Sequence, residues 1–243
     1  VQYWLPQGHI DFLAYAPYDS KYDKKVTKDN QELNFIVSPT IKDQKDLLWA
    51  KATNQTMANN SGTDKKVKFQ FAHALSRLGY TVKLNKEYTG TTITLNKITL
   101  AGSKDGNQKA FYPNGTINLS TGIWTPSTSD EKLNFEWFTN TSGTELTTDA
   151  TTNAVDNFLF VIPQDFSASE TDKLYVIVEY TIKGYNGVKT PMKNTVYQKL
   201  EKDFEQGKAY TINLFLGLTP IEFDVTTVEG WIDNNQGEIN SWN

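Results

Sequence analysis

Side chains that could perform catalysis are sparse in this sequence. Its two histidines, His9 and His73, lie 64 positions apart. His73 falls on the expected inward face of a strand, where a hydrogen-bonded core histidine is the usual arrangement, and His9 precedes a strand in polar surroundings. The chain lacks the serine-hydrolase, zinc-protease, phosphate-loop and dinucleotide motifs. With no cysteine either, thiolate chemistry and cysteine metal sites are excluded. We therefore expect no catalytic residue, no metal site and no cofactor.

Two acidic patterns offer weak alternatives. Glycoside hydrolysis needs two carboxyl groups about 5–10 Å apart in a cleft, and with 28 acidic residues spacing along the chain carries no such signal. Residues 233–238 (DNNQGE) resemble a calcium loop. Their glycine is at the fifth position, whereas the EF-hand pattern needs it at the sixth, so a plain turn is expected there.

Charge and hydropathy exclude other classes. The net charge is −4, and the basic residues are lysines apart from Arg77. Without a basic stripe or arginine forks, nucleic acid is not an expected partner. The mean hydropathy is −0.53, and no apolar run approaches the roughly 20 residues of a membrane helix. Because the chain starts at Val1 with neither an initiator methionine nor a leader, we expect a processed or trimmed product.

Composition and periodicity predict an all-β protein. Threonine occurs 30 times and aromatic residues make up 13% of the chain, which suits pleated, half-buried surfaces. Apolar residues alternate with polar ones around 67–71, 174–182 and 212–218, as in strands with one buried face. Val67, Phe69 and Phe71 should line a core. The alternation then slips by one residue, which predicts a β-bulge near Leu78–Gly79.

A stretch rich in proline, glycine, serine and threonine spans residues 112–130. Such composition is typical of connections between domains. The sequence therefore predicts two β-domains, residues 1–128 and 129–243. Trp49, Trp124 and Trp137 lie in or beside apolar runs, so core packing is their expected role.

The polar C-terminal tail carries spaced apolar residues. Such a segment either forms the last strand of its own sheet or adds to an exposed sheet edge of another chain, which would supply main-chain hydrogen bonds. We keep both alternatives. The residues concerned are Val225, Val228, Trp231, Ile232, Ile239 and Trp242.

Three segments in the first hundred residues carry a family resemblance. They are residues 12–17 (FLAYAP), 46–50 (DLLWA) and 67–78 (VKFQFAHALSRL). In this order they resemble the fimbrillin-like proteins of Bacteroidales, the subunits of type V pili. The FAHALS sequence at 71–76 is the most specific element, and the likeness is looser in the second half of the chain.

The resemblance implies two tandem transthyretin-like Greek-key β-sandwich domains, and export to the outer membrane or a pilus. In that family a protease removes the first strand of the N-terminal domain, and a strand of a neighbouring subunit fills the groove. This chain begins near what would be the second strand. Implied partners are other pilus subunits, as a homo- or hetero-polymer, together with a host or bacterial surface ligand. Membrane attachment would come only through a lipid anchor that this chain does not contain.

The leading hypothesis is therefore a non-enzymatic structural or adhesive pilus subunit that assembles by β-strand complementation. Val67, Phe69 and Phe71 would line the groove, and the tail residues would supply the inserted strand. The alternative is a carbohydrate-binding surface lipoprotein of the outer membrane, suggested by the aromatic content, with Trp231 and Trp242 as exposed stacking residues.

Overall fold

The computed structural model describes residues 7–22, 27, 30–59, 66–152, 157–167, 171–218 and 222–229. Regular structure in these residues is almost entirely β, as predicted, with two short 3-10 turns at Ile41–Asp43 and Tyr185–Gly187. In this part of the chain no helix has the length and apolar character needed to cross a membrane. The strands are β1 (Ile10–Ala16), β2 (Glu32–Ile36), β3 (Leu48–Gln55), β4 (Ala72–His73), β5 (Ser76–Leu84), β6 (Thr92–Ala101), β7 (Asn114–Asn118), β8 (Trp124–Pro126), β9 (Phe135–Glu145), β10 (Thr151–Thr152), β11 (Leu159–Val161), β12 (Gln164–Asp165), β13 (Tyr175–Lys183), β14 (Met192–Lys199), β15 (Asp203–Phe204), β16 (Lys208–Leu216) and β17 (Glu222–Glu229).

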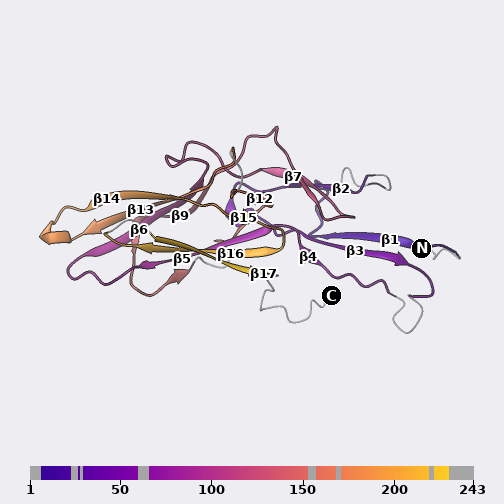
Figure 1. The fold of residues 1–243 in the computed structure, drawn as a ribbon, viewed down its shortest axis with the longest axis horizontal. Coiled ribbons are helices and arrows are strands. Elements are labelled where there is room, and N and C mark those ends of the chain that lie inside the picture. Colours follow the sequence, from indigo (N-terminus) through magenta and orange to yellow (C-terminus); the bar gives the residue numbers. More distant parts are fainter. Residues whose placement is uncertain are drawn as a thin grey trace.

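Two three-stranded sheets lie at one end of an elongated molecule (Figure 1). Their strand orders are β1-β3-β4 and β2-β7-β8. The second sheet includes β7 and β8, which lie within the stretch expected to link two domains. That expectation is wrong because residues 114–126 fold into a hairpin. Gly122 takes φ +79° at its turn, where a Cβ would clash with the Trp49 ring.

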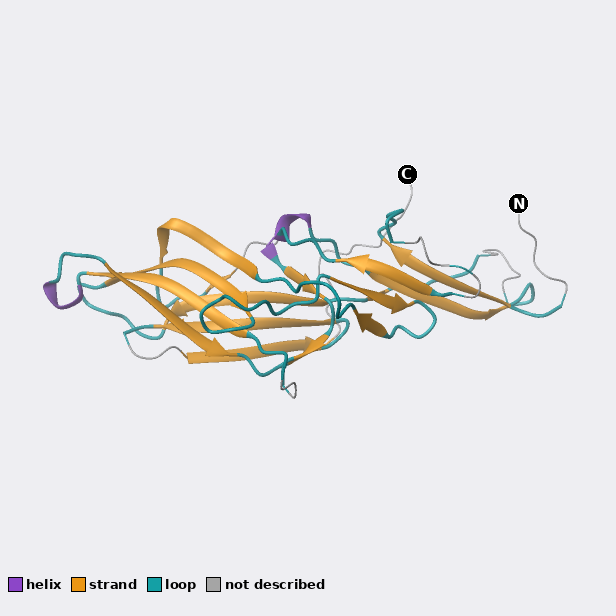
Figure 2. Ribbon diagram, turned by 90° about the horizontal axis from the view of Figure 1, so that it is seen from above, coloured by secondary structure: helices purple, strands orange, loops and turns teal. Residues whose placement is uncertain are grey.

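The other end holds two larger sheets, which form a sandwich (Figures 1 and 2). One has the order β14-β13-β6-β9, and the other has the order β10-β5-β16-β17 with β11 also pairing with β5. Strand β16 runs parallel to β5 and antiparallel to β17. The inner faces meet through Tyr80 of β5 and Trp137 of β9, whose ring centroids are 5.0 Å apart. This all-β, sandwich-like architecture confirms the predicted fold class.

The sheets do not divide where the sequence suggested. Strands β5 and β6 precede residue 128, yet they pair with β16 and β13 from the second half of the chain. Sheet membership instead groups most residues before 75, together with β7 and β8, on one side, and β5, β6 and nearly everything after residue 133 on the other. A division into two domains stays a proposal, and its boundaries would follow this grouping.

A break between β4 and β5 sends the chain from one sheet group to the other. Strand β4 pairs with β3, whereas β5 pairs with β16. Ala74 and Leu75 lie between them and are fully buried. The phase slip predicted at Leu78–Gly79 therefore occurs earlier, where the strand leaves one sheet for another. Beyond it, alternate residues Tyr80, Val82 and Leu84 of β5 are buried.

A two-stranded ladder of β12 and β15 places Asp165 directly opposite Asp203. The hydrogen bond with Asp165, followed by desolvation, raises the pKa of Asp203 above its ordinary 3.8, although the Ser167 hydroxyl donates to both carboxylates at 2.8 and 3.0 Å. Like charges opposed across strands destabilise a sheet. The folded protein therefore disfavours the ionised form of Asp203.

We expect Asp203→Asn to stabilise the protein at pH 7. The amide can donate to Asp165 and removes one charge of the pair, so the gain should be about 0.5 kcal/mol after solvent screening, or roughly 1–2 °C in Tm. Because the folded pKa is raised, the penalty vanishes once the pH falls below the unfolded value of about 3.8. Thermal unfolding at pH 7 and pH 3 tests this, and an equal gain at both pH values would contradict it.

Candidate assembly interface

Strand β3 is the central strand of the β1-β3-β4 sheet, at one end of the molecule. On one side it pairs with β1 from Leu48 to Gln55. On the other side its ladder with β4 covers Leu48 and Trp49 alone. Among the described residues, β3 therefore has a ladder partner on only one side from Ala50 to Gln55. We call this stretch the open edge.

The side of the open edge can be assigned from hydrogen bonds at its two ends. The backbone N–H of Asn54 donates to Asp11 Oδ1 at 2.8 Å, toward β1. The carbonyl of Leu47 accepts from the N–H of Ala74 at 2.7 Å, on the β4 side. Because backbone groups alternate along a strand, the N–H groups of Lys51 and Thr53 face the open edge.

The residues predicted to line a groove lie just before β4, in a stretch outside any ladder. Val67 and Phe69 are half-buried, while Phe71 is 43% exposed. The Phe71 ring lies 6.1 Å from that of Phe69. The prediction that Phe71 faces the core is wrong. Residues 66–71 form no sheet ladder, so the alternation of apolar and polar residues there does not place every second side chain in the core. These aromatic side chains instead lie partly at the surface, next in sequence to the ladder end.

The predicted inserted strand divides into two parts. Val225 and Val228 lie in β17, which pairs along its length with β16 of its own sheet, and Val225 packs against the core. Strand β17 is the last strand of that sheet. Trp231, Ile232, Ile239 and Trp242 lie outside the described residues, as does the calcium-like loop at 233–238. The backbone of Val225 and Val228 is thus paired within their own sheet, and a part in assembly stays a prediction for all six residues.

The predicted core side chains behave largely as expected. Trp137 is buried, and Trp49 and Trp124 pack against the core. The His73 Nδ1 atom lies 2.5 Å from Asp46 Oδ2, which ties β4 to the residues that lead into β3. The next hydroxyl along the chain, that of Ser76, donates to the carbonyl of Glu205 at 2.7 Å. The His73–Asp46 pair thus fixes the end of the β3–β4 ladder.

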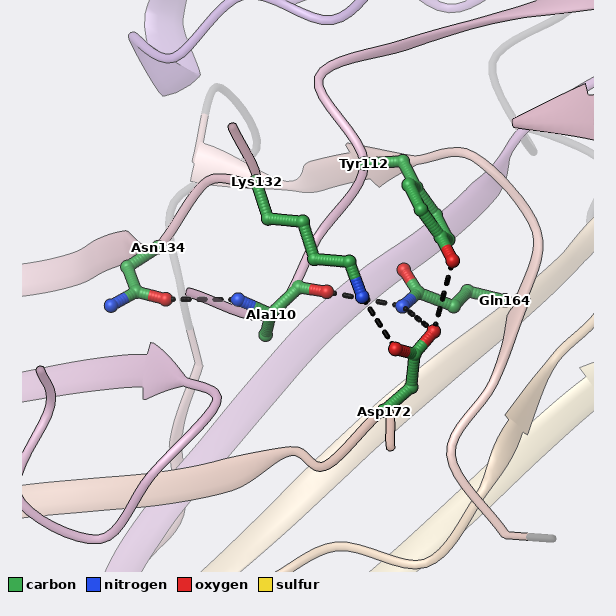
Figure 3. A network of polar contacts seen from close by, with 6 residues as sticks. All are labelled: Ala110, Tyr112, Lys132, Asn134, Gln164 and Asp172. Atoms are coloured by element: carbon green, nitrogen blue, oxygen red, sulfur yellow. Dashed lines mark hydrogen bonds and ion pairs between the residues drawn. The ribbon is translucent and has the colours of Figure 1, made fainter. Parts of the chain in front are cut away.

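A polar network joins segments that are distant in sequence (Figure 3). Asp172 accepts hydrogen bonds from Lys132 Nζ at 2.5 Å, from Gln164 Nε2 at 3.0 Å and from the Tyr112 hydroxyl at 3.1 Å. The Lys132 ammonium also lies 4.5 Å from the Tyr112 ring centroid. This network was not predicted, because nothing in sequence links positions 40 and 60 residues apart.

The electrostatics of the network indicate a structural role. Burial alone would raise the pKa of Asp172, but hydrogen bonds from Lys132, Gln164 and Tyr112 and the lysine charge outweigh it and hold the pKa below its ordinary value. An Asp that stays ionised and paired is not a general acid or base near neutral pH. Among the residues that the structure describes, no group of three or more histidine or acidic side chains could hold a metal ion.

A description of fimbrillin-like proteins matches this chain over residues 1–231. The chain belongs to the fimbrillin-like family. Among solved structures, this fimbrillin-like chain is similar to a fimbrial protein from Bacteroides vulgatus, with a TM-score of 0.70, 21% identity and coverage of 95% of this chain and 80% of that one. It is also similar to a proposed cell adhesion protein from Bacteroides uniformis, with a TM-score of 0.54, 20% identity and coverage of 95% and 77%. No curated protein matches it. At these identities the structures show a shared fold.

Proposed function

We propose that this fimbrillin-like chain is a structural or adhesive subunit of a bacterial surface pilus that assembles by β-strand complementation, with no enzymatic activity. The open edge of β3 carries the proposal, since it presents backbone donors and acceptors beside partly exposed aromatic side chains. An unpaired edge is a template for a strand from another chain. Its place would be the cell surface, with other copies or other pilus subunits as partners.

The energetics indicate what such a strand must bring. Lys51 and Thr53, the two residues that face the open edge of β3, offer about four backbone hydrogen bonds at roughly 1 kcal/mol each. Covering Phe69 and Phe71 adds roughly 1–2 kcal/mol each. The total of about 6–8 kcal/mol falls within the association cost of about 4–15 kcal/mol. A lasting polymer therefore requires apolar side chains on the inserted strand as well.

The segment after β17 has such side chains. Because β17 pairs with β16 along its length, the inserted part would begin after Glu229, with Trp231, Ile232, Ile239 and Trp242 as anchors. Strand β17 would then keep the donor attached to its own subunit.

Blocking one backbone donor tests the proposal. The Thr53 N–H faces the open edge, so Thr53→Pro removes it while leaving the β1 side of the ladder intact. We expect Thr53→Pro to abolish polymer formation, and Thr53→Ala, which keeps the N–H, to leave it unchanged. Light scattering after gel filtration measures the polymers, and circular dichroism shows that both variants fold.

Removing the proposed inserted strand gives the second arm. A chain ending at Glu229 keeps β17 and should remain monomeric. The 243-residue chain, which keeps the tail, should form polymers only when the open edge of β3 is also unaltered. Polymers of unchanged length from the truncated chain would remove the tail from the mechanism, and unchanged polymers from Thr53→Pro would remove the open edge.

A further inference from the structure

The outer face of the β14-β13-β6-β9 sheet is hollowed, although the proposed assembly does not use it. Two clefts of about 350 and 410 Å3 lie on this face. They share Lys97, Glu179 and Thr195 as lining residues, so they form one continuous groove across the sheet, which we call the outer groove. Clefts of about 300–1,000 Å3 are the usual size of ligand sites.

A bulge and a looped-out segment form the first cleft. Strand β6 has one extra residue, Asn96, between the pairs Leu95↔Tyr180 and Lys97↔Glu179. Opposite it, β9 pairs at Thr139 and again at Thr144, so residues 140–143 stand out from the ladder. Such bulges re-aim side chains and are frequent beside binding sites.

Internal hydrogen bonds hold this wall in place. The Thr181 hydroxyl donates to Asn96 Oδ1 at 2.7 Å. The Asn140 amide donates to Thr144 Oγ1 at 3.0 Å, and Asn140 Oδ1 accepts from the N–H of Ser142 at 3.1 Å. The wall is therefore organised before any ligand arrives, which lowers the cost of binding.

The loop after β6 forms the wall of the second cleft. Gly106 lies above Ile177 of β13, and Asp105 accepts hydrogen bonds from both the backbone and the side chain of Asn107. At this end of the face, Tyr197 of β14 is 48% exposed, and the ammonium of Lys104 lies 5.9 Å from its ring centroid. Tyr197 thus offers a ring face at the margin of the outer groove.

The lining indicates the class of ligand. Three lysines (Lys97, Lys104 and Lys193) face three carboxylates (Asp105, Glu136 and Glu179), so their formal charges cancel. The remaining lining is mainly threonine and asparagine, whose hydroxyl and amide groups can each donate and accept. The side chains of Glu179 and Lys193 have no ion-pair or hydrogen-bond partner among the described residues. A balanced, polar groove with a partly exposed aromatic ring at its margin suits a neutral molecule rich in hydroxyl groups.

We propose that the outer groove binds a neutral saccharide chain. A sugar ring stacks on Tyr197 through its apolar C–H face. Its hydroxyl groups donate to the Glu179 carboxylate and accept from the Lys193 ammonium and the asparagine amides. The proposal concerns an adhesive ligand of the folded subunit and does not depend on polymer formation.

The test uses affinity electrophoresis of the full-length chain in native gels. The neutral probes are dextran, yeast mannan and barley β-glucan, and heparin is the anionic comparator. We expect at least one neutral polysaccharide to retard the wild-type chain. Tyr197→Ala and Glu179→Ala should each weaken the retardation constant about tenfold, which corresponds to roughly 1.4 kcal/mol. Tyr18→Ala alters a tyrosine that is 70% exposed and lies outside the groove, so it should change nothing.

Three results would overturn the proposal. They are no retardation by any of the neutral polysaccharides, retardation by heparin alone, and neutral binding that survives both groove variants. Thermal unfolding of each variant separates loss of binding from loss of folding. If Thr53→Pro abolishes polymers but leaves the retardation intact, assembly and saccharide binding are independent properties of the chain.

Discussion

Phe166→Ala should lower the free energy of unfolding by about 3–5 kcal/mol, more than any other substitution proposed for this protein. Phe166 is 1% exposed and stands in a run of aromatic contacts. Its ring centroid lies 5.6 Å from that of Phe111 and 5.9 Å from that of Phe204, and the run continues from Phe204 to Tyr210 at 5.0 Å. Truncation leaves a cavity among aromatic rings from separate segments of the chain, which the surrounding sheets cannot close.

The measurement is urea unfolding followed by circular dichroism. A loss of this size would lower Tm by roughly 8–15 °C in a chain of this length. Phe166→Leu keeps most of the volume and should cost less than about 1.5 kcal/mol. Phe71→Ala is the surface control, with an expected change of about 0.5 kcal/mol or less. Similar losses for Phe166→Ala and Phe71→Ala would show that the run does not carry the core.

Strands with one buried face were predictable from the sequence, because successive side chains of a strand point to opposite faces of the sheet and apolar residues mark the buried face. In β13, Val176, Val178 and Tyr180 are buried and lie in the predicted segment. The same reasoning holds for Ile212 and Leu214 of β16. Local pattern is sufficient there because both strands lie inside sheets and are held on both sides.

Sheet membership was not predictable from the same pattern. Alternation in β5 is the same whether the strand pairs with its neighbours in sequence or, as observed, with β16 in parallel. For this reason the boundary at residue 128 had no counterpart in the sheets, and the segment from 112 to 130 looked like a linker although it contains a hairpin. The prediction that residues 67, 69 and 71 line the core failed for the opposite reason. Apolar and polar residues alternate in this segment, but no neighbouring strand fixes which side of it is buried.

The outer groove was equally hidden. It depends on one unpaired residue, Asn96, and on four residues of β9 that leave the ladder. Both are register features, and register is a relation between strands that a single sequence does not display. The threonine-rich composition indicated polar outer faces, but not that one of them would be hollow.

The aromatic run and the polar network meet at consecutive residues. Phe111 belongs to the run, and its neighbour Tyr112 donates to Asp172 in the network. Phe111 also forms a bridge with Leu133, next to Lys132. One short segment beside β7 is thus fixed by apolar packing on one side and by charge-assisted hydrogen bonds on the other.

Asp172→Asn tests the polar side of this junction, and we expect it to lower the free energy of unfolding at pH 7 by about 2 kcal/mol. The amide keeps the shape of the carboxylate but leaves the Lys132 ammonium, whose side chain is 24% exposed, without its counter-ion. Because the folded pKa of Asp172 is lowered, its stabilisation is complete above the unfolded value of about 3.8 and is lost as the pH falls through the folded value. The difference between wild type and variant should therefore shrink from pH 5 to pH 2.

A matched surface pair separates this effect from the general cost of removing a charge. Lys109 and Glu131 are 2.7 Å apart, with Glu131 81% exposed, so Glu131→Gln should cost less than about 0.5 kcal/mol. Urea unfolding of both variants between pH 2 and pH 7 makes the comparison. If Asp172→Asn lost no more than Glu131→Gln, or lost the same amount at every pH, the network would not couple the segments, and the aromatic run alone would hold the junction.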